Sequence, residues 1–168
     1  QGIVDLNSVI RDMKELLRVT AGPGVHLVLV LGEETPVVRA DAARLRQVIL
    51  NLAMNGTEAM QGRSGVISIT TGQQHCDPAD LRTPWADDPL PGGEYAWVEV
   101  ADTGCGIVPE TLTRIFDPFF TTKFTGRGLS LAAVLGIVRS HNGAILVRSA
   151  PGKGSAFKVL LPRAQEKG

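Results

Sequence analysis

The stretch from Ala42 to about Met60 constrains the fold more than any other part of this chain. Asp41 supplies an N-cap, and "QGRSG" ends the helical pattern. Within the stretch, "ARLRQVILNLAMNGTEAM" carries an apolar stripe at helical spacing, formed by Leu45, Val48, Ile49, Leu52, Gly56 and Ala59. The stripe predicts a long helix that packs one face against a core.

Three polar residues, Asn51, Asn55 and Glu58, lie together along one flank of that stripe. Such side chains beside a core face are costly unless each finds a partner. One interpretation is that they bind neighbouring loops. The other is an oxygen-lined site for a hard cation such as Mg²⁺, which takes few protein ligands and keeps several waters. The helix alone leaves both interpretations open.

The rest of the chain alternates between helical and extended patterns. Further helices are predicted from Leu6 to Leu17, behind the N-cap Asp5, and from about Leu129 to Ser140. Residues 73–93 are rich in Pro, Gly and Asp and are expected to form a long excursion within the domain. Strands are predicted over residues 25–31, 36–40, 66–72, 94–102, 144–149 and 155–161. The first of these strands barely alternates and is expected to be buried on both faces.

Together these elements predict an α+β fold, a two-layer sandwich in which three helices cover one face of a mixed sheet of about five strands. The length of 168 residues suits a single domain, and an apolar share of 43% is enough for a core. The net charge of zero gives no electrostatic reason to expect a nucleic acid or an anionic membrane as partner.

Simple sequence features argue against a membrane-spanning segment, a signal peptide and a cysteine-based metal site. No apolar run reaches the ~20 residues of a membrane span, and no signal peptide is visible. Cys76 and Cys105 match no metal-ligand spacing and are expected to be unpaired thiols of a reducing compartment. The chain begins with Gln1, so we expect it to be a piece of a longer protein.

A glycine-rich stretch follows the predicted strand 94–102. In "VADTGCGI", Asp102 ends the strand, while Gly104 and Gly106 allow a tight turn and a close approach of the backbone to a ligand. A carboxylate in this place can accept a hydrogen bond from an exocyclic amine such as that of adenine. An ordinary Asp-Gly turn is the other interpretation, and the stretch taken alone slightly favours that turn.

Two further stretches are compatible with a nucleotide. In "TGRGLSLAAV", Gly126 and Gly128 come directly before a helix, where free backbone N–H groups favour an anion such as phosphate. The pattern is neither a Walker A loop nor a dinucleotide fingerprint. In "GKGSAF", the hydroxyl of Ser155 either faces a base pocket or belongs to a simple hairpin turn.

In their order along the chain, these stretches resemble the ATP-binding catalytic domain of two-component sensor histidine kinases. This domain belongs to the superfamily shared with gyrase, heat-shock chaperone and mismatch-repair ATPases. "QVILNLAMNGTEAM" resembles the N box, "DTGCGI" the first glycine box, "IFDPFFTTK" the F box, "GRGLSL" the second glycine box and "GKGSAF" the last. The resemblance runs from about Val4 to Pro162 and implies a Bergerat-type fold.

The resemblance also implies an organisation and a set of roles. Residues 1–168 would form one catalytic domain, with an ATP lid at about 115–128 and a polar tail at 163–168. Asn55 would bind Mg²⁺, and Asn55 and Lys123 would act in catalysis. The adenine amine would be bound by Asp102, supported through water by Ser155. The implied ATP site is completed by Asn51, Glu58, Gly104, Gly106, Ile107, Phe116, Lys123, Gly126, Arg127, Gly128, Leu129 and Ser130.

One position favours a kinase over an ATPase. Hydrolysing relatives place a glutamate four residues before the metal-binding asparagine, where it acts as a general base for water. Here that position is Asn51, whose amide is not basic. Bound ATP would therefore be hydrolysed slowly and would pass its γ-phosphoryl to a histidine, a transfer that relies on positioning and charge neutralisation.

Two positions depart from the usual motifs. The third glycine of the second glycine box is Ser130, whose side chain would enter the first helical turn near the phosphates. It would either donate a hydrogen bond there or crowd the nucleotide, and we expect retained binding with reduced affinity. Gly56 stands where alanine is commoner, which we expect to cost the helix about 1 kcal/mol and little else.

None of the histidines, His26, His75 and His141, lies in the acidic-flanked helical context of a phosphoacceptor. The resemblance therefore implies a monomeric cytoplasmic fragment that acts on its own dimerisation and phosphoacceptor domain and, downstream, on a response-regulator receiver domain. Whether the full-length protein is soluble or membrane-anchored is left open. The alternatives are a nucleotide-binding or docking module impaired at Ser130 and an ATPase of the gyrase and chaperone type.

Overall fold

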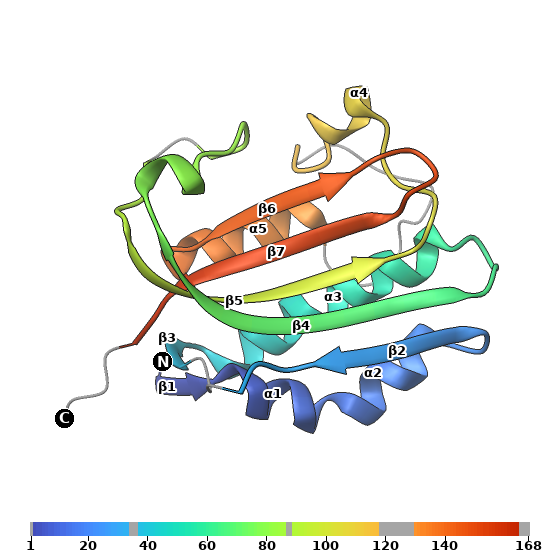
Figure 1. The fold of residues 1–168 in the computed structure, drawn as a ribbon, viewed down its shortest axis with the longest axis horizontal. Coiled ribbons are helices and arrows are strands. Elements are labelled where there is room, and N and C mark those ends of the chain that lie inside the picture. Colours follow the sequence, from blue (N-terminus) through green and yellow to red (C-terminus); the bar gives the residue numbers. More distant parts are fainter. Residues whose placement is uncertain (1, 34–36, 87–88, 118–129, 165–168) are drawn as a thin grey trace.

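The computed structural model describes residues 2–33, 37–86, 89–117 and 130–164. A five-stranded sheet forms one layer, and helices cover one of its faces (Figure 1). Only β2 and β4 pair in parallel; the other neighbours are antiparallel. In spatial order the strands are β2 (Val25–Val30), β4 (Gly65–Cys76), β5 (Gly93–Asp102), β7 (Ser155–Pro162) and β6 (Ala144–Ser149).

The helical layer consists of α1 (Leu6–Asp12), α2 (Lys14–Ala21), α3 (Ala42–Ala59) and α5 (Leu131–Ser140). A short helix, α4 (Pro109–Leu112), follows β5, and a 3-10 helix, η1 (Pro78–Leu81), follows β4. Two short strands, β1 (Gly2–Asp5) and β3 (Val37–Ala40), form a separate antiparallel pair. The predicted α+β class and two-layer architecture are confirmed.

The main core lies between the sheet and the helices. Alternate residues of the strands face the helices, so that Ile67 and Ile69 of β4 are buried together with Ile49 and Leu52 of α3. A smaller apolar cluster lies on the opposite face of the sheet and contains Cys76, Leu81, Tyr95, Ala144 and Leu160. The sheet is therefore covered on both faces near the β4–β5 connection, where Cys76 at the end of β4 is fully buried.

Near the N-terminus one predicted helix differs from the structure, and one pair of strands was not predicted. The helix predicted from Leu6 to Leu17 is divided at Met13, whose N–H donates to the carbonyl oxygens of Val9 and Ile10. The apolar pattern continues through the division, because Met13 itself is buried in the core. Periodicity alone therefore could not reveal the break, and the pair β1–β3 was also not anticipated.

The prediction that residues 25–31 form a strand buried on both faces is wrong. β2 is an edge strand whose side chains alternate between the core and solvent. Leu27 and Leu29 pack on the core, whereas Val28 and Val30 are 40% and 57% exposed. An apolar run did not distinguish a central strand from an edge strand with valines on its outer face.

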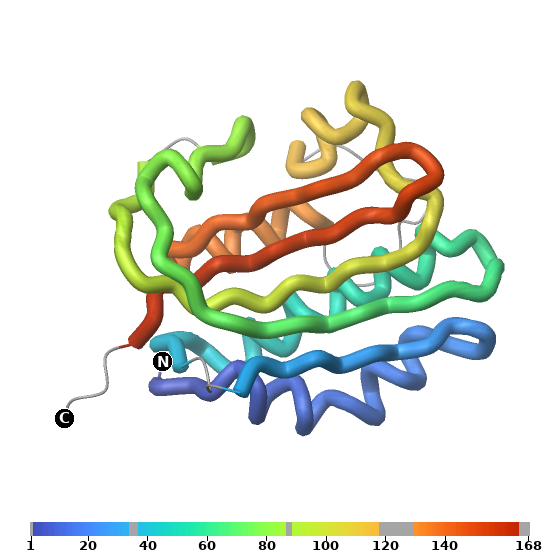
Figure 2. The backbone as a smooth tube through the Cα atoms, viewed as in Figure 1, coloured from blue at the N-terminus to red at the C-terminus, as the bar shows by residue number. Residues whose placement is uncertain are grey.

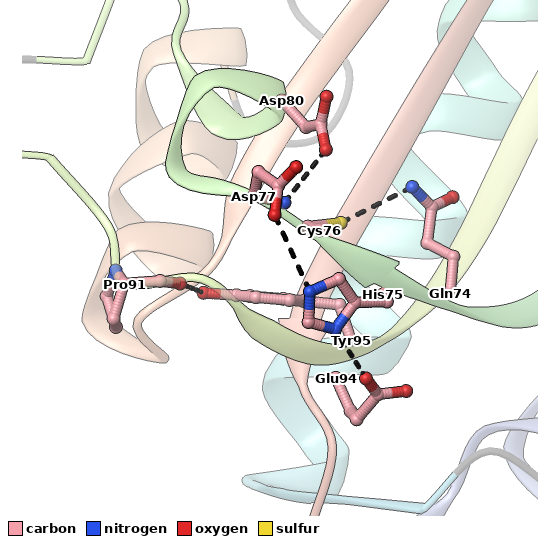
Figure 3. Close-up of polar contacts among 8 residues, drawn as sticks. All are labelled: Gln74, His75, Cys76, Asp77, Asp80, Pro91, Glu94 and Tyr95. Carbon is pink, nitrogen blue, oxygen red and sulfur yellow. Dashed lines mark hydrogen bonds and ion pairs between the residues drawn. The ribbon is translucent and has the colours of Figure 1, made fainter.

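The long excursion begins later than predicted, because β4 continues as far as Cys76. Figure 2 shows the green chain leaving the sheet after β4 and returning to it as β5. Figure 3 shows the polar contacts at its base. His75 Nδ1 lies 2.6 Å from a carboxylate oxygen of Glu94 on the paired strand, a hydrogen bond that raises the pKa of His75. The Tyr95 hydroxyl donates to the carbonyl oxygen of Pro91 at 2.7 Å. These contacts hold the two ends of the excursion close to each other.

A buried polar network joins α1 to the sheet. The Thr71 hydroxyl donates to Asn7 Oδ1 at 2.6 Å and accepts from the Gly32 N–H at 2.9 Å. Asn7 Nδ2 donates to the Gly32 carbonyl oxygen at 2.9 Å. Because each of these groups is paired inside the protein, the network fixes the start of α1 against β4 and the chain after β2.

The described ends of the chain lie at the same end of the sheet (Figure 2). Arg163, just after β7, forms an isolated antiparallel bridge with Val38 of β3, which pairs in turn with β1. Within the described residues, no helix combines the length and the apolar character that a membrane crossing requires.

Candidate functional site

The C-terminal half of α3 lies against the end of β5. A β-carbon at Gly56 would be only 3.2 Å from the β-carbon of Asp102 and 3.4 Å from the δ-carbon of Ile67. The expectation that Gly56 matters only for helix stability is therefore too narrow, because the missing side chain makes room for Asp102. The next residue back along the helix is Asn55, so the predicted metal ligand and the predicted adenine acceptor lie in adjacent parts of the fold.

The polar flank of α3 is formed as predicted. Asn51 is 6% exposed, and its Nδ2 donates to the Gln47 carbonyl oxygen one turn earlier at 2.6 Å. Asn55 differs, because its Nδ2 is buried without a hydrogen-bond partner. An unpaired buried amide is costly, and a ligand group at this point would pair it. Glu58 is half-buried on the same flank.

Asp102 is the last residue of β5 and faces the helical layer. Its carboxylate accepts the Gly104 N–H at 2.8 Å. Burial raises the pKa of Asp102, and the backbone N–H groups of Gly104 and Ser155 partly oppose this shift. A half-buried carboxylate with a raised pKa at the end of a strand is a candidate ligand-binding group.

Three glycines let the surrounding loops pack backbone against backbone. A β-carbon at Gly104 would lie 2.7 Å from the backbone of Ala59 at the end of α3. Gly106 and Gly154 both have a φ in the left-handed region, +74° and +78°. A side chain at either would collide with a carbonyl oxygen, that of Ala150 or that of Asp102, at 2.0 Å. The first glycine box therefore lies between α3 and the β6–β7 hairpin.

Ser155 and Ser149 form a pair of hydroxyls beside Asp102. Asp102 and Ser155 are directly opposed on β5 and β7, and Ser155 is opposed to Ser149 on β6. The two serine hydroxyl oxygens are 2.8 Å apart, and Ser155 is only 7% exposed. Ser149 also accepts the N–H of Ile107, a predicted site residue, at 2.8 Å. Ser149 itself was not predicted, although its place opposite Ser155 in the hairpin could have pointed to it.

Phe116 of the F box, which the resemblance places in the implied ATP site, is buried. Its ring packs against Trp85, which belongs to the excursion between β4 and β5. The Trp85 indole N–H donates to the Ile145 carbonyl oxygen of β6 at 3.0 Å. No sequence signal indicated this contact, because Trp85 lies in a Pro- and Asp-rich segment without periodicity.

Ser130 lies at the beginning of α5 but outside its first turn. The helix starts at Leu131 rather than at 129, and Ser130 is its N-cap, with Oγ accepting the Ala133 N–H at 3.1 Å. The expectation that the Ser130 side chain enters the first helical turn is thus corrected to a capping role. The other predicted phosphate-site residues, Lys123, Gly126, Arg127, Gly128 and Leu129, lie outside the described residues.

The remaining candidate groups lie away from this site. A groove of about 850 Å³ is lined by the excursion and the C-terminal end of α5, and it contains none of the predicted residues. His141 is buried, and its Nε2 accepts the N–H of Asp41, the N-cap of α3, at 3.2 Å. Cys76 and Cys105 are unpaired, as predicted. In the described parts of the chain, no group of three His, Cys, Asp or Glu side chains could hold a metal ion.

Comparisons with known proteins identify the family of this chain. Residues 40–165 match the model of the "Histidine kinase-, DNA gyrase B-, and HSP90-like ATPase" family. The sensor kinase CckA of Brucella abortus (strain 2308) is 38% identical over 98% of this chain, which spans 17% of CckA. The chain thus covers a small part of that relative's length.

Solved structures give the same result. The catalytic domain of the histidine kinase ThkA, in a nucleotide-free form, superposes with a TM-score of 0.71 at 29% identity over 96% of this chain and 95% of its own. Full-length ShkA in complex with AMPPNP superposes with a TM-score of 0.76 at 28% identity over 99% of this chain and 32% of its own. The resemblance to the ATP-binding catalytic domain of sensor histidine kinases is confirmed, and the chain belongs to the histidine kinase-, DNA gyrase B- and HSP90-like ATPase family.

Proposed function

We propose that this chain is the catalytic domain of a sensor histidine kinase, which binds Mg-ATP and donates the γ-phosphoryl group to a histidine on a separate dimerisation and phosphoacceptor domain. The observation that carries the proposal is the convergence of Asp102, Gly104 and Asn55 at one end of the sheet. The related ShkA structure supports it, since that protein was solved with AMPPNP.

Asp102 would bind the base. Its carboxylate already accepts one backbone N–H from the turn that follows it, and its remaining lone pairs can accept the exocyclic amine of adenine. Gly104, Gly106 and Ile107 would form the wall beside the base, because the absence of side chains at the glycines leaves the loop close to α3 and to the β6–β7 hairpin. Ser155, opposite Asp102 on β7, would support this contact through water.

Asn55 is suited to the metal-phosphate end of the site. Its buried amide has an unsatisfied nitrogen, and a half-turn of the amide would present the oxygen instead. The group therefore fits either a phosphate oxygen or a magnesium ion as its partner. Mg²⁺, when bound, neutralises charge on the transferring phosphoryl group. Asn51 and Glu58 line the same flank of α3 and would complete the polar surroundings.

Asn51 supports a kinase rather than a hydrolase. It is one helical turn before Asn55, and its Nδ2 is engaged with Gln47. An amide cannot accept a proton from water as a general base does. Water at this point would not be activated, so bound ATP would remain available for another acceptor.

The other parts of the proposal rest on the resemblance to sensor kinases. Residues 1–168 would act as one domain, with residues 115–128 as the ATP lid and Lys123, Gly126, Arg127, Gly128, Leu129 and Ser130 at the phosphates. The phosphoacceptor domain of the same protein and a response-regulator receiver domain would be its partners, in the cytoplasm. The isolated domain would be a monomer.

The proposal is tested by titrating the 168-residue chain with ATP, with and without Mg²⁺, in an isothermal calorimeter. We expect Asn55→Ala to abolish Mg-dependent binding while leaving the free energy of unfolding unchanged or higher, because the wild-type amide nitrogen has no partner to lose. Asn51→Ala is the control that does lose a hydrogen bond, to Gln47. Unchanged Mg-ATP affinity in Asn55→Ala would contradict the metal assignment.

Two other outcomes would favour other functions. Binding of Mg-ATP no tighter than about 1 mM in the wild type, restored by Ser130→Gly, would support an impaired nucleotide-binding or docking module. Rapid release of phosphate over many turnovers by the isolated chain would support an ATPase instead.

A further inference from the structure

We propose that Ser149 is a positioning residue that fixes the direction of the Ser155 hydroxyl and thereby makes the base site select a nucleobase with an exocyclic amine. The inference rests on the proposed function, because it concerns the same nucleotide site. It adds to that function a residue whose contacts determine which base is accepted.

The hydrogen bonds of Ser149 determine the direction of the contact between the two serines. Ser149 has one hydroxyl proton, which it donates to the Gly154 carbonyl oxygen at 3.0 Å. It accepts the Ile107 N–H at 2.8 Å. The remaining contact, 2.8 Å to the Ser155 hydroxyl, must therefore be donated by Ser155. Ser149 then has no further proton to give.

This arrangement decides what Ser155 can offer a ligand. Since its only proton is directed at Ser149, the Ser155 oxygen presents lone pairs alone. The cross-strand partner of Ser155 is Asp102, whose carboxylate is also an acceptor. The base site is consequently lined by two hydrogen-bond acceptors on the same face of the sheet. A base that presents an amine can satisfy them, whereas a base that presents a carbonyl oxygen at the same point faces lone pairs only.

Ser149 also has a structural role that must be separated from this one. It joins Ile107, in the first glycine box, to Gly154, in the β6–β7 turn. Losing its hydroxyl would leave both of these backbone groups without this partner and would loosen the two loops. Loosening lowers the affinity for every nucleotide by a similar factor. A change in selectivity between two bases is therefore the distinguishing measurement.

The experiment compares the affinities of the 168-residue chain for ATP and for inosine triphosphate, which carries a carbonyl oxygen in place of the 6-amino group. In wild type we expect ATP to bind more tightly. In Ser149→Ala the Ser155 hydroxyl is free to rotate and donate to that carbonyl, so the ratio of the two affinities should fall by about tenfold. Ser149→Thr keeps a hydroxyl and should restore the wild-type ratio.

A double variant keeps the test informative if Ser149→Ala lowers stability. Because Ser149 acts on the base through Ser155, Ser149→Ala should not alter the ratio further in a Ser155→Ala background. An equal loss of both affinities in Ser149→Ala, with the ratio unchanged, would overturn the inference while leaving the proposed function intact. A wild-type chain that binds neither nucleotide would overturn the proposed function and the inference together.

Discussion

The ring of Phe116 lies against the indole of Trp85, with ring centroids 4.8 Å apart and planes inclined at 46°. Phe116 is in the F box, near the start of the segment, about residues 115–128, that the family resemblance assigns to the ATP lid. Trp85 is in the excursion between β4 and β5 and is held to the edge strand β6 by its hydrogen bond to Ile145. The excursion therefore supports the F box from a distant part of the sequence.

A double-mutant cycle between Trp85 and Phe116 measures this support. We expect a coupling free energy of about 1 kcal/mol between Trp85→Ala and Phe116→Ala in the free energy of unfolding, the usual contribution of a tilted aromatic pair beyond its buried area. The control is Trp97, the other tryptophan, which lies flat over Gly72 beneath Lys158. The effects of Trp97→Ala and Phe116→Ala on the free energy of unfolding should add. If the effects of Trp85→Ala and Phe116→Ala also added, the contact between the two rings would not stabilise either segment.

The raised pKa of Asp102 predicts a pH dependence of ATP binding. The carboxylate must be ionised to act as the amine acceptor, so affinity should fall with decreasing pH, beginning at a higher pH than for an ordinary aspartate. Calorimetric titration across the acidic range would measure this. Asp102→Asn should bind weakly at all pH values and lack this dependence.

The same shift has a consequence for stability. Because the folded-state pKa lies above the unfolded one, Asp102 contributes most favourably below its unfolded pKa, and this contribution is lost as the pH rises through its folded pKa. Asp102→Asn should therefore melt at a higher temperature than wild type near neutral pH, with the difference decreasing in acid. A difference independent of pH would contradict the assignment of the shift to Asp102.

The chain's local chemistry accounts for what could be predicted from sequence. The stripe and polar flank of α3 fixed its length and its orientation toward a core, and the strand ending at Asp102 led directly into the glycine turn. These features depend on neighbours within a few residues. Three other features could not be predicted: the unpaired Asn55 nitrogen, the Trp85–Phe116 contact and the edge position of β2. They depend on how segments that are distant in the sequence pack together, and a local sequence pattern does not contain this information.

Two helical glycines provide a matched comparison for the space beside Asp102. Gly136 in α5 is exposed, and a β-carbon there would meet no neighbour, so Gly136→Ala should stabilise the protein by about 1 kcal/mol. Gly56→Ala gains the same helix propensity but presses against Asp102. We therefore expect Gly56→Ala to raise the free energy of unfolding, measured by chemical denaturation, by less than Gly136→Ala does, and to lower the affinity for ATP. If both variants were stabilised equally and the affinity for ATP were unchanged, Asp102 would have to move aside at no cost.

The buried network around Thr71 should be sensitive to loss of one hydroxyl. Thr71→Val keeps the shape but leaves Asn7 Oδ1 and the Gly32 N–H without this partner, so we expect a loss of about 2 kcal/mol in the free energy of unfolding. Thr70→Val, on the neighbouring half-buried position of the opposite face, should change stability by less than about 0.5 kcal/mol. Urea denaturation of both variants would reveal whether the network or the strand itself carries the effect.

Two substitutions of Ser130 distinguish a helix-capping role from steric interference with the nucleotide. Its Oγ accepts the Ala133 N–H, so Ser130→Ala should lower the free energy of unfolding by about 1 kcal/mol, whereas Ser130→Gly, with a residue that is itself tolerated as an N-cap, should lower it by only a few tenths. The hydroxyl already has this partner and lies outside the first turn, so Ser130→Gly should raise Mg-ATP affinity only slightly. Thermal denaturation and calorimetry on the two variants separate the effects. A large gain in affinity in Ser130→Gly alone would mean that the side chain obstructs the phosphates, since both substitutions remove the hydroxyl but only glycine also removes the β-carbon.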